Sequence, residues 1–198
     1  MFLVLHGQTE WNRDGRVQGH LDSPLTEDGR RQAVKAADIL QGQNIVPGAC
    51  AIVCSPIGRT RETARIIGTE LGFDISTIRS DERLKEVSLG QWEGHTYSEV
   101  EELWPDKIAG SNRYNWYFRS PDGESYDDVA IRLGGWLKAH AERDELIVVT
   151  HGIASRVLRG LYVGLALEDA LQLEVARDVV FQLSGGGVTK LAATPARR

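Results

Sequence analysis

Short apolar runs alternate with stretches of helical periodicity along most of this chain. The runs that indicate buried strands are residues 1–6, 50–55, 145–152 and a pair around the glycine-rich turn within 179–193. Helical spacing of apolar residues recurs over residues 26–42, 56–72, 124–144 and 153–164. Such alternation, with strands apolar on both faces, predicts a mostly parallel central sheet with helices on both faces. The expected fold class is therefore α/β, a single three-layer α/β/α domain over residues 1–198.

Cap and turn residues mark the ends of two of the predicted helices. Thr26 is expected to cap a helix that ends before Gly42. Pro56 is expected to open the next helix, because the first turn of a helix tolerates proline, and Gly72 to end it.

The middle of the chain has a less regular pattern. We expect a short extended piece at 75–78, a loop with a little strand at 81–94 and a short helix at 96–106. Residues 110–123 combine aromatic and turn-forming residues, which indicates a segment that crosses over the sheet outside the core.

Composition and charge exclude several classes of protein. The net charge is −5, and no stretch gathers more than a few Lys or Arg residues, so we expect no nucleic-acid partner. No apolar run approaches the ~20 residues of a membrane span, and no basic segment precedes an apolar one at the start of the chain. The expectation is a cytoplasmic protein that does not bind membranes, either a monomer or a homodimer.

The two cysteines of the chain, Cys50 and Cys54, lie in one predicted strand. Four residues of strand span about 13 Å, which exceeds the Cα separation of under about 7 Å in a disulfide. We therefore expect two reduced core residues.

A histidine followed by glycine ends two of the buried strands, at His6-Gly7 and His151-Gly152. In open α/β sheets the ligand crevice lies beyond the carboxyl ends of the strands. Both imidazoles are therefore expected to face one pocket, and both glycines to let backbone approach a ligand closely. Two facing imidazoles suit either metal ligation or phosphate chemistry. Their spacing matches no recognised metal motif, and no acidic residue flanks either pair.

The segment "SPIGRTRETA" favours phosphate over metal. It places Arg59 just inside a helix that follows a strand. A guanidinium there can bind phosphate oxygens in a bidentate way, and a helix N-terminus favours an anion. Taken alone, Arg59 could equally be a solvated surface residue.

Together these segments resemble the histidine phosphatase superfamily, also called the phosphoglycerate mutase-like family, over nearly the whole chain. "LHGQTEWN" resembles the signature Arg-His-Gly-x-Thr-x-x-Asn, and "SPIGRTRETA" the second phosphate motif of the family. "RLKEVSLGQWEG" resembles its acid-bearing segment and "VVTHGIASRVL" its second-histidine motif. "GHLDSPLTEDGRRQA" and "PDGESYDD" match the intervening segments in order.

The resemblance implies a role for each matching residue. His6 would be the nucleophile that forms a phosphohistidine, and Glu86 the general acid and base. His151 would stabilise charge on the transferring phosphoryl oxygens. Phosphate would be bound by Asn12, Arg59 and the N–H of Gly152, with Gln18 on the substrate side. The chemistry would need no metal and no cofactor.

One position departs from the signature, because Leu5 stands where the family has arginine. That guanidinium binds the same phosphate in the family. The loss implies a slow enzyme, a replacement by another cation such as Arg16 or Arg156, or a degenerate member of the family.

The functional expectation is a phosphomonoesterase acting on a small phosphorylated metabolite. A mutase needs extra loop and tail to exclude water, and the short chain favours hydrolysis. Mutase-type phosphoryl transfer, a non-catalytic phospho-metabolite binder and a metal-dependent hydrolase are the alternatives. The aromatic residues 114–118 would either cap the pocket and select the substrate or serve as ordinary surface packing.

Overall fold

A six-stranded sheet forms the centre of the computed structural model, which describes residues 1–141 and 145–193. Its strands are β1 Phe2–Leu5, β2 Ala51–Cys54, β3 Arg79–Ser80, β4 Leu146–Thr150, β5 Val179–Ser184 and β6 Gly187–Ala192. In the order β3-β2-β4-β1-β5-β6, the first four are parallel, and β5 and β6 form an antiparallel hairpin at one edge. The predicted mostly parallel α/β sheet is confirmed.

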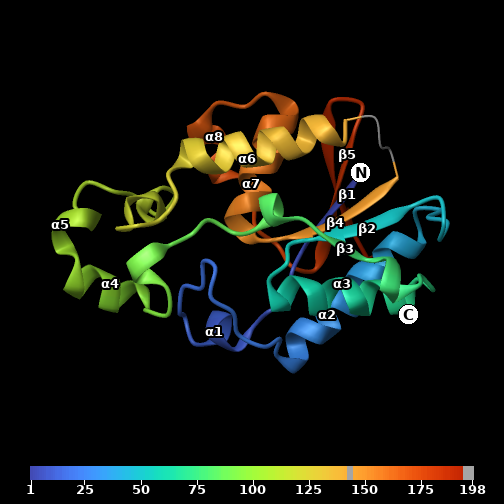
Figure 1. The fold of residues 1–198 in the computed structure, drawn as a ribbon, viewed down its shortest axis with the longest axis horizontal. Coiled ribbons are helices and arrows are strands. Elements are labelled where there is room, and N and C mark those ends of the chain that lie inside the picture. The colour runs from blue at the N-terminus through green and yellow to red at the C-terminus, as the bar shows by residue number, and fades with distance from the viewer. Residues whose placement is uncertain (142–144, 194–198) are drawn as a thin grey trace.

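Successive side chains of a strand point to opposite faces of the sheet, and both faces are buried under helices. On β1, Leu3 and Leu5 join one apolar cluster and Phe2 and Val4 the other. Helices α2 (Glu27–Gln41) and α3 (Gly58–Glu70) cover the second face. The first is covered by α6 (Tyr126–Ala139), α7 (Gly152–Val163) and α8 (Leu167–Gln172), so three layers result (Figure 1).

The helix ends follow the cap residues closely. Thr26 accepts a hydrogen bond from the N–H of Gly29 and begins α2, as predicted. Helix α3 begins at Gly58 rather than at Pro56, because Ile57 holds the extended N-cap conformation. The sequence did not predict α8.

The middle segment differs from the prediction in several elements. Residues 75–78 form a 3₁₀ turn, Ile75–Thr77, before the two-residue β3. Residues 81–94 hold two more 3₁₀ turns, Glu82–Leu84 and Gly90–Trp92, in place of the expected bit of strand. The predicted short helix is two helices, α4 (Tyr97–Leu103) and α5 (Pro105–Ile108), which lie to one side of the sheet (Figure 1). A last 3₁₀ turn, Trp116–Arg119, follows α5 in the chain. A further short helix, the four-residue α1 (Glu10–Arg13), lies near the start of the chain.

The aromatic segment is part of the core, contrary to the prediction that it crosses outside it. Tyr117 is buried, and Trp116 and Phe118 pack against the same apolar cluster. The ring of Trp116 stacks on buried Trp92 at a centroid distance of 5.7 Å. Aromatic rings of this size bury a large apolar area when they pack together. This burial places the segment in the core, although turn-forming residues surround its aromatic residues.

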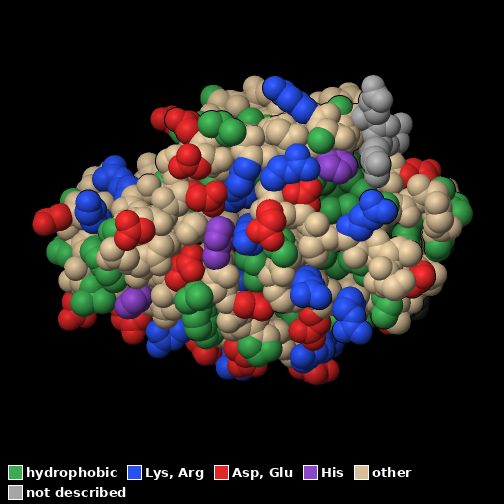
Figure 2. Space-filling view, in the orientation of Figure 1, with side chains coloured by type: hydrophobic (Ala, Val, Ile, Leu, Met, Phe, Trp, Pro, Cys, Tyr) green, Lys and Arg blue, Asp and Glu red, His purple; other side chains and the backbone are tan. Residues whose placement is uncertain are grey.

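The surface and the cysteines agree with the sequence as far as the structure describes them. Acidic and basic side chains are mixed on the face shown in Figure 2. Among the described residues, no helix combines the length and apolar character required to cross a membrane. Cys50 and Cys54 are both buried and free, as predicted.

Candidate active site

A cavity of about 240 Å³ lies beyond the carboxyl ends of the parallel strands. The backbone N–H of His6, just after β1, donates to the carbonyl of Thr150 at 3.0 Å, so the ends of β1 and β4 lie side by side. Six of the seven predicted site residues line this cavity: His6, Asn12, Gln18, Arg59, Glu86 and Gly152. His151, the seventh, is fully buried and lies behind His6, with ring centroids 5.2 Å apart.

The ring of His6 is fixed in one tautomer by the backbone beside it. Its Nδ1 lies 2.7 Å from the carbonyl oxygen of Gly7. Because a carbonyl only accepts, Nδ1 carries the proton and Nε2 keeps a free lone pair. Burial, the charge of Arg59 and the charge of Arg177 lower the pKa of His6 well below its ordinary value, against a smaller raising effect of the Gly7 bond. The imidazole is therefore neutral near pH 7, as a nucleophile must be.

Gly7 is required by packing against α2. A Cβ on Gly7 would lie 2.1 Å from the carbonyl oxygen of Gly29 in α2. Its N–H donates to the hydroxyl of Thr63 at 3.1 Å. The loop that carries His6 is thus clamped between α2 and α3.

His151 is held between two hydrogen-bond partners. Nε of Arg59 donates to Nδ1 of His151 at 3.2 Å, so Nδ1 is the unprotonated nitrogen. Nε2 then carries the proton and donates to the hydroxyl of Ser55 at 2.8 Å. Burial, followed by the charge of Arg59, lowers the pKa of His151 well below its ordinary value. In this arrangement His151 is a neutral ring that supports the back of the cavity.

Arg59 is buried, and most of its donors bind the protein itself. Besides His151, its guanidinium donates to the carbonyls of Leu21 and Gly19, at 2.6 and 2.8 Å, and to the carboxylate of Asp22 at 3.3 Å. Arginine has five N–H donors, so one on Nη2 is left for the cavity. The sequence predicted that the guanidinium of Arg59 can bind two phosphate oxygens at once. With one N–H left for the cavity, this geometry does not provide such a bidentate contact. Burial lowers the pKa of Arg59, while the carboxylates of Glu86 and Asp22 oppose that effect.

The carboxyl group of Glu86 sits at the N-terminus of α7. Its Oε1 accepts from the N–H of Val87 and of Ala154, at 3.1 and 2.9 Å, and Oε2 accepts from Ile153 at 3.1 Å. A carboxylate has about four lone-pair sites, so one remains on Oε2. Among the described residues, none accepts a hydrogen bond from the N–H of Gly152, which also lines the cavity.

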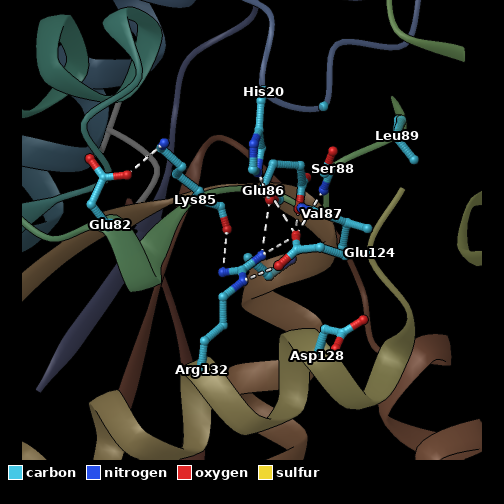
Figure 3. Close-up of polar contacts among 12 residues, drawn as sticks. His20, Glu82, Lys85, Glu86, Val87, Ser88, Leu89, Glu124, Asp128 and Arg132 are labelled. Atoms are coloured by element: carbon cyan, nitrogen blue, oxygen red, sulfur yellow. Dashed lines mark hydrogen bonds and ion pairs between the residues drawn. The ribbon is translucent and has the colours of Figure 1, made fainter. Parts of the chain in front are cut away.

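An arginine of α6 braces the segment that carries Glu86. Figure 3 shows Arg132 reaching from α6 to Glu124, whose two carboxylate oxygens it contacts at 2.7 and 2.9 Å. The same guanidinium donates, at 2.7–3.0 Å, to the carbonyl oxygens of Arg83, Lys85 and Glu86. Sequence reasoning missed this brace, because Arg132 acts on backbone carbonyls, which carry no residue-type signal.

Asn12 and Gln18 are oriented by neighbouring polar groups. The side-chain oxygen of Asn12 accepts from the N–H of Thr9 in a capping box at the start of α1. The hydroxyl of Ser23 donates to the side-chain oxygen of Gln18 at 3.2 Å. Among the described residues, none accepts a hydrogen bond from the amide NH₂ group of either side chain, and both residues line the cavity.

The two cations proposed to replace the signature arginine lie in different places. Arg16 lines the cavity, but its Nη1 donates to the carbonyl of Gly94 and pairs with Glu99 at 3.2 Å. Arg156 donates to the carbonyl of Leu173 and is not among the residues that line the cavity. A third arginine, Arg177, lines it beside His6 and Glu86. The sequence contained no motif that marked Arg177.

Within the part of the chain that the structure describes, no three or more His, Cys, Asp and Glu side chains form a group that could hold a metal ion. The residues of the cavity instead offer N–H donors, the guanidinium groups of three arginines and one carboxyl group. That set matches an oxyanion better than a cation.

The fold and this cavity define the class of protein, and comparison with known families agrees. The chain belongs to the histidine phosphatase superfamily (branch 1), whose family model matches residues 1–191. It is 36% identical, over 171 residues, to the probable phosphoglycerate mutase GpmB of Cronobacter sakazakii, covering 83% of this chain and 75% of the relative.

Solved structures of the same architecture include two at 30% identity. Bacillus stearothermophilus YhfR superimposes with a TM-score of 0.79, over 95% of this chain and 93% of that one. The mycobacterial glucosyl-3-phosphoglycerate phosphatase in complex with VO3 superimposes with a TM-score of 0.75, over 100% and 99%.

Proposed function

We propose that this protein is a phosphomonoesterase that hydrolyses a small phosphorylated metabolite through a phosphohistidine on His6. The observation that carries the proposal is the hydrogen bond from Nδ1 of His6 to the Gly7 carbonyl. It presents the unprotonated Nε2 of a neutral imidazole in the same cavity as the carboxyl group of Glu86. A positioned nucleophile and a proton carrier are the two parts that covalent phosphoryl transfer needs.

The first half of the proposed reaction forms the phosphoenzyme. The Nε2 lone pair of His6 attacks phosphorus, and the bond from phosphorus to the ester oxygen breaks. Glu86, which enters this step protonated, transfers its proton to the departing oxygen, so the product leaves as an alcohol. The remaining N–H of Arg59, the N–H of Gly152 and the amide of Asn12, which all line the cavity, would donate to phosphoryl oxygens.

The second half returns the enzyme to its starting state. Glu86, now a carboxylate, accepts a proton from a water molecule as that water attacks phosphorus. The bond between phosphorus and Nε2 breaks, which releases inorganic phosphate, neutral His6 and protonated Glu86. Backbone N–H groups hold the carboxyl group through both halves, so the same oxygen can give and take the proton.

Transfer to a second phosphoglycerate, rather than to water, is the other candidate activity. It is supported by the 36% identity to a protein described as a probable phosphoglycerate mutase. Hydrolysis is supported by the similarity to a glucosyl-3-phosphoglycerate phosphatase. Both names point to phosphorylated glycerate derivatives as the first substrates to test.

The decisive experiment labels the enzyme with a ³²P-phosphomonoester and quenches it rapidly. We expect acid-labile, base-stable label on His6, and none in His6→Asn. Chase of the phosphoenzyme into water supports hydrolysis, and chase only into added phosphoglycerate supports the mutase. Label on a serine would overturn the mechanism, and tight ester binding without label or turnover would favour a non-catalytic binder.

Metal dependence is tested in the same assay. The proposed chemistry neutralises phosphate with N–H donors and guanidinium groups, so turnover should survive EDTA. Loss of turnover in EDTA, restored by a divalent cation, would favour the metal-dependent alternative.

A further inference from the structure

The substitution of leucine for the signature arginine removes a cation from the end of β1. Leu5 is 2% exposed and belongs to the same apolar cluster as Leu84 and Val87. It is not among the residues that line the cavity. A dianionic phosphate in this cavity therefore receives no charge from position 5.

Arg59 alone is a weak substitute for the signature arginine, because most N–H groups of its guanidinium already donate to other residues of the protein. Four of its N–H groups are bound to His151, Leu21, Asp22 and Gly19, and one is left over. Binding of phosphate through two oxygens at once needs a guanidinium with a free edge.

Arg177 has such a guanidinium, and it lines the same cavity. Among the described residues, none accepts a hydrogen bond from its side chain, and its Nε is buried without a partner. Burial lowers the pKa of Arg177, and the carboxylate of Glu86 acts in the opposite direction. The charge of Arg177 in turn lowers the pKa of His6, which places it close to the nucleophile.

Arg177 lies in the loop between α8 and β5, and residues on both sides of it in that loop contact helices. The carbonyl of Glu174 accepts from Arg159 of α7 at 2.6 Å. On the other side, Asp178 pairs with Lys35 of α2 at 3.0 Å. With its neighbours anchored to two helices, the backbone of Arg177 is positioned before any ligand arrives.

We propose that Arg177 is the second phosphate-binding guanidinium of this cavity and takes the part that position 5 plays in the signature. It would donate to nonbridging oxygens of the phosphoryl group while His6 attacks phosphorus. The inference rests on the proposed function, since it assigns a residue to the same phosphate. A buried cation without a protein acceptor costs folding free energy, and an anion bound beside it would offset that cost.

The test compares Arg177→Met with the parent protein and with Lys190→Met. Lys190 pairs with Glu174 on the surface, outside the cavity, so its loss changes the net charge equally. Titration with inorganic phosphate and with vanadate, followed by calorimetry, measures binding without requiring turnover. We expect Arg177→Met to weaken both affinities by about 10- to 100-fold, the range for a hydrogen bond to a charged group. Lys190→Met should match the parent, and Arg177→Lys should recover part of the loss.

Two further readouts separate phosphate binding from a merely structural role. The ligand-free melting temperature of Arg177→Met should equal or exceed that of the parent, because the variant removes a buried N–H without an acceptor. The pKa of His6, followed by NMR, should rise in the same variant. A lower melting temperature with affinities within twofold of the parent would overturn the inference.

Failure of the inference is distinguishable from failure of the proposed function. If a phosphohistidine forms normally while Arg177→Met binds phosphate as the parent does, only the inference is overturned. If no phosphomonoester yields turnover or label, the proposed function fails, and the phosphate titrations still decide whether Arg177 binds the anion. A parent protein that binds neither phosphate nor vanadate would overturn both.

Discussion

Acidification should destabilise this protein well above the pH at which carboxylates titrate. His6 and His151 are both buried and neutral, and burial lowers the pKa of each well below its ordinary value. In the unfolded chain both return to a pKa of about 6.5. Below that pH the unfolded state binds more protons than the folded state, so the free energy of unfolding falls as pH falls. Above about pH 6.5 neither state binds these protons, and the stabilisation is fully present.

The size of the effect follows from this difference in protonation. At about pH 5.5, protonation of one unfolded histidine stabilises the unfolded state by about 1.4 kcal/mol, so the pair contributes about 3 kcal/mol. Urea unfolding at about pH 8 and pH 5.5 measures this difference, with the fluorescence of buried Trp92 and Trp136 as the signal.

Variants assign the loss to the two rings. His6→Gln should show about half of the parent's pH dependence. Ile147→Val, a buried substitution that removes no titrating group, should be destabilised by about 0.5–1.5 kcal/mol and keep the full pH dependence. A parent whose free energy of unfolding changes by less than about 1 kcal/mol between the two pH values would show that these rings accept protons in the folded state, and the reasoning would fail.

Three further substitutions test the site. Gly7→Ala should destabilise the fold by about 1–3 kcal/mol or more, because its Cβ would meet a backbone oxygen of α2, whereas Gly135→Ala, with open space around it, should be neutral or stabilising in thermal melts. Glu86→Gln should slow esters with poor leaving groups far more than p-nitrophenyl phosphate, and equal losses in steady-state kinetics would remove Glu86 from the acid role. Leu5→Arg should lower the melting temperature, since it buries a charge in the core, and should not raise kcat/KM, since Arg177 already places a guanidinium in the cavity; a tenfold gain in kcat/KM would contradict this.

The parts of the fold that the sequence predicted share a strong local signal. β1 and β4 are unbroken apolar runs, and α2 has both a regular apolar face and the cap residue Thr26. The proximity of His6 and His151 was predictable for a related reason. Parallel strands end at the same edge of a sheet, so residues that end two buried strands meet there.

The aromatic segment could not be placed in this way. Tyr117 lies among turn-forming residues with no regular period, and its burial depends on Trp92 and other residues distant in sequence. Local pattern carries no information about such a partner. The same limit applies to Arg132, which acts through the carbonyl oxygens of three residues more than forty positions away.

The proposed roles of Leu5 and Arg177 would explain how a motif along the chain can mislead about a site that is assembled in space. A phosphate needs positive charge at one point, and any segment of backbone that reaches that point can supply it. On the proposal for Arg177, the charge would move from β1 to the loop before β5, and the end of β1 would be free to carry an apolar side chain, which is buried in the core as Leu5. The guanidinium would then come from Arg177, 172 positions after Leu5 in the chain. The segment that carries it is anchored at Glu174 and Asp178. If Arg177 binds the phosphate, the missing signature arginine is a change in where the charge originates, and the chain keeps the two guanidinium groups that the chemistry requires.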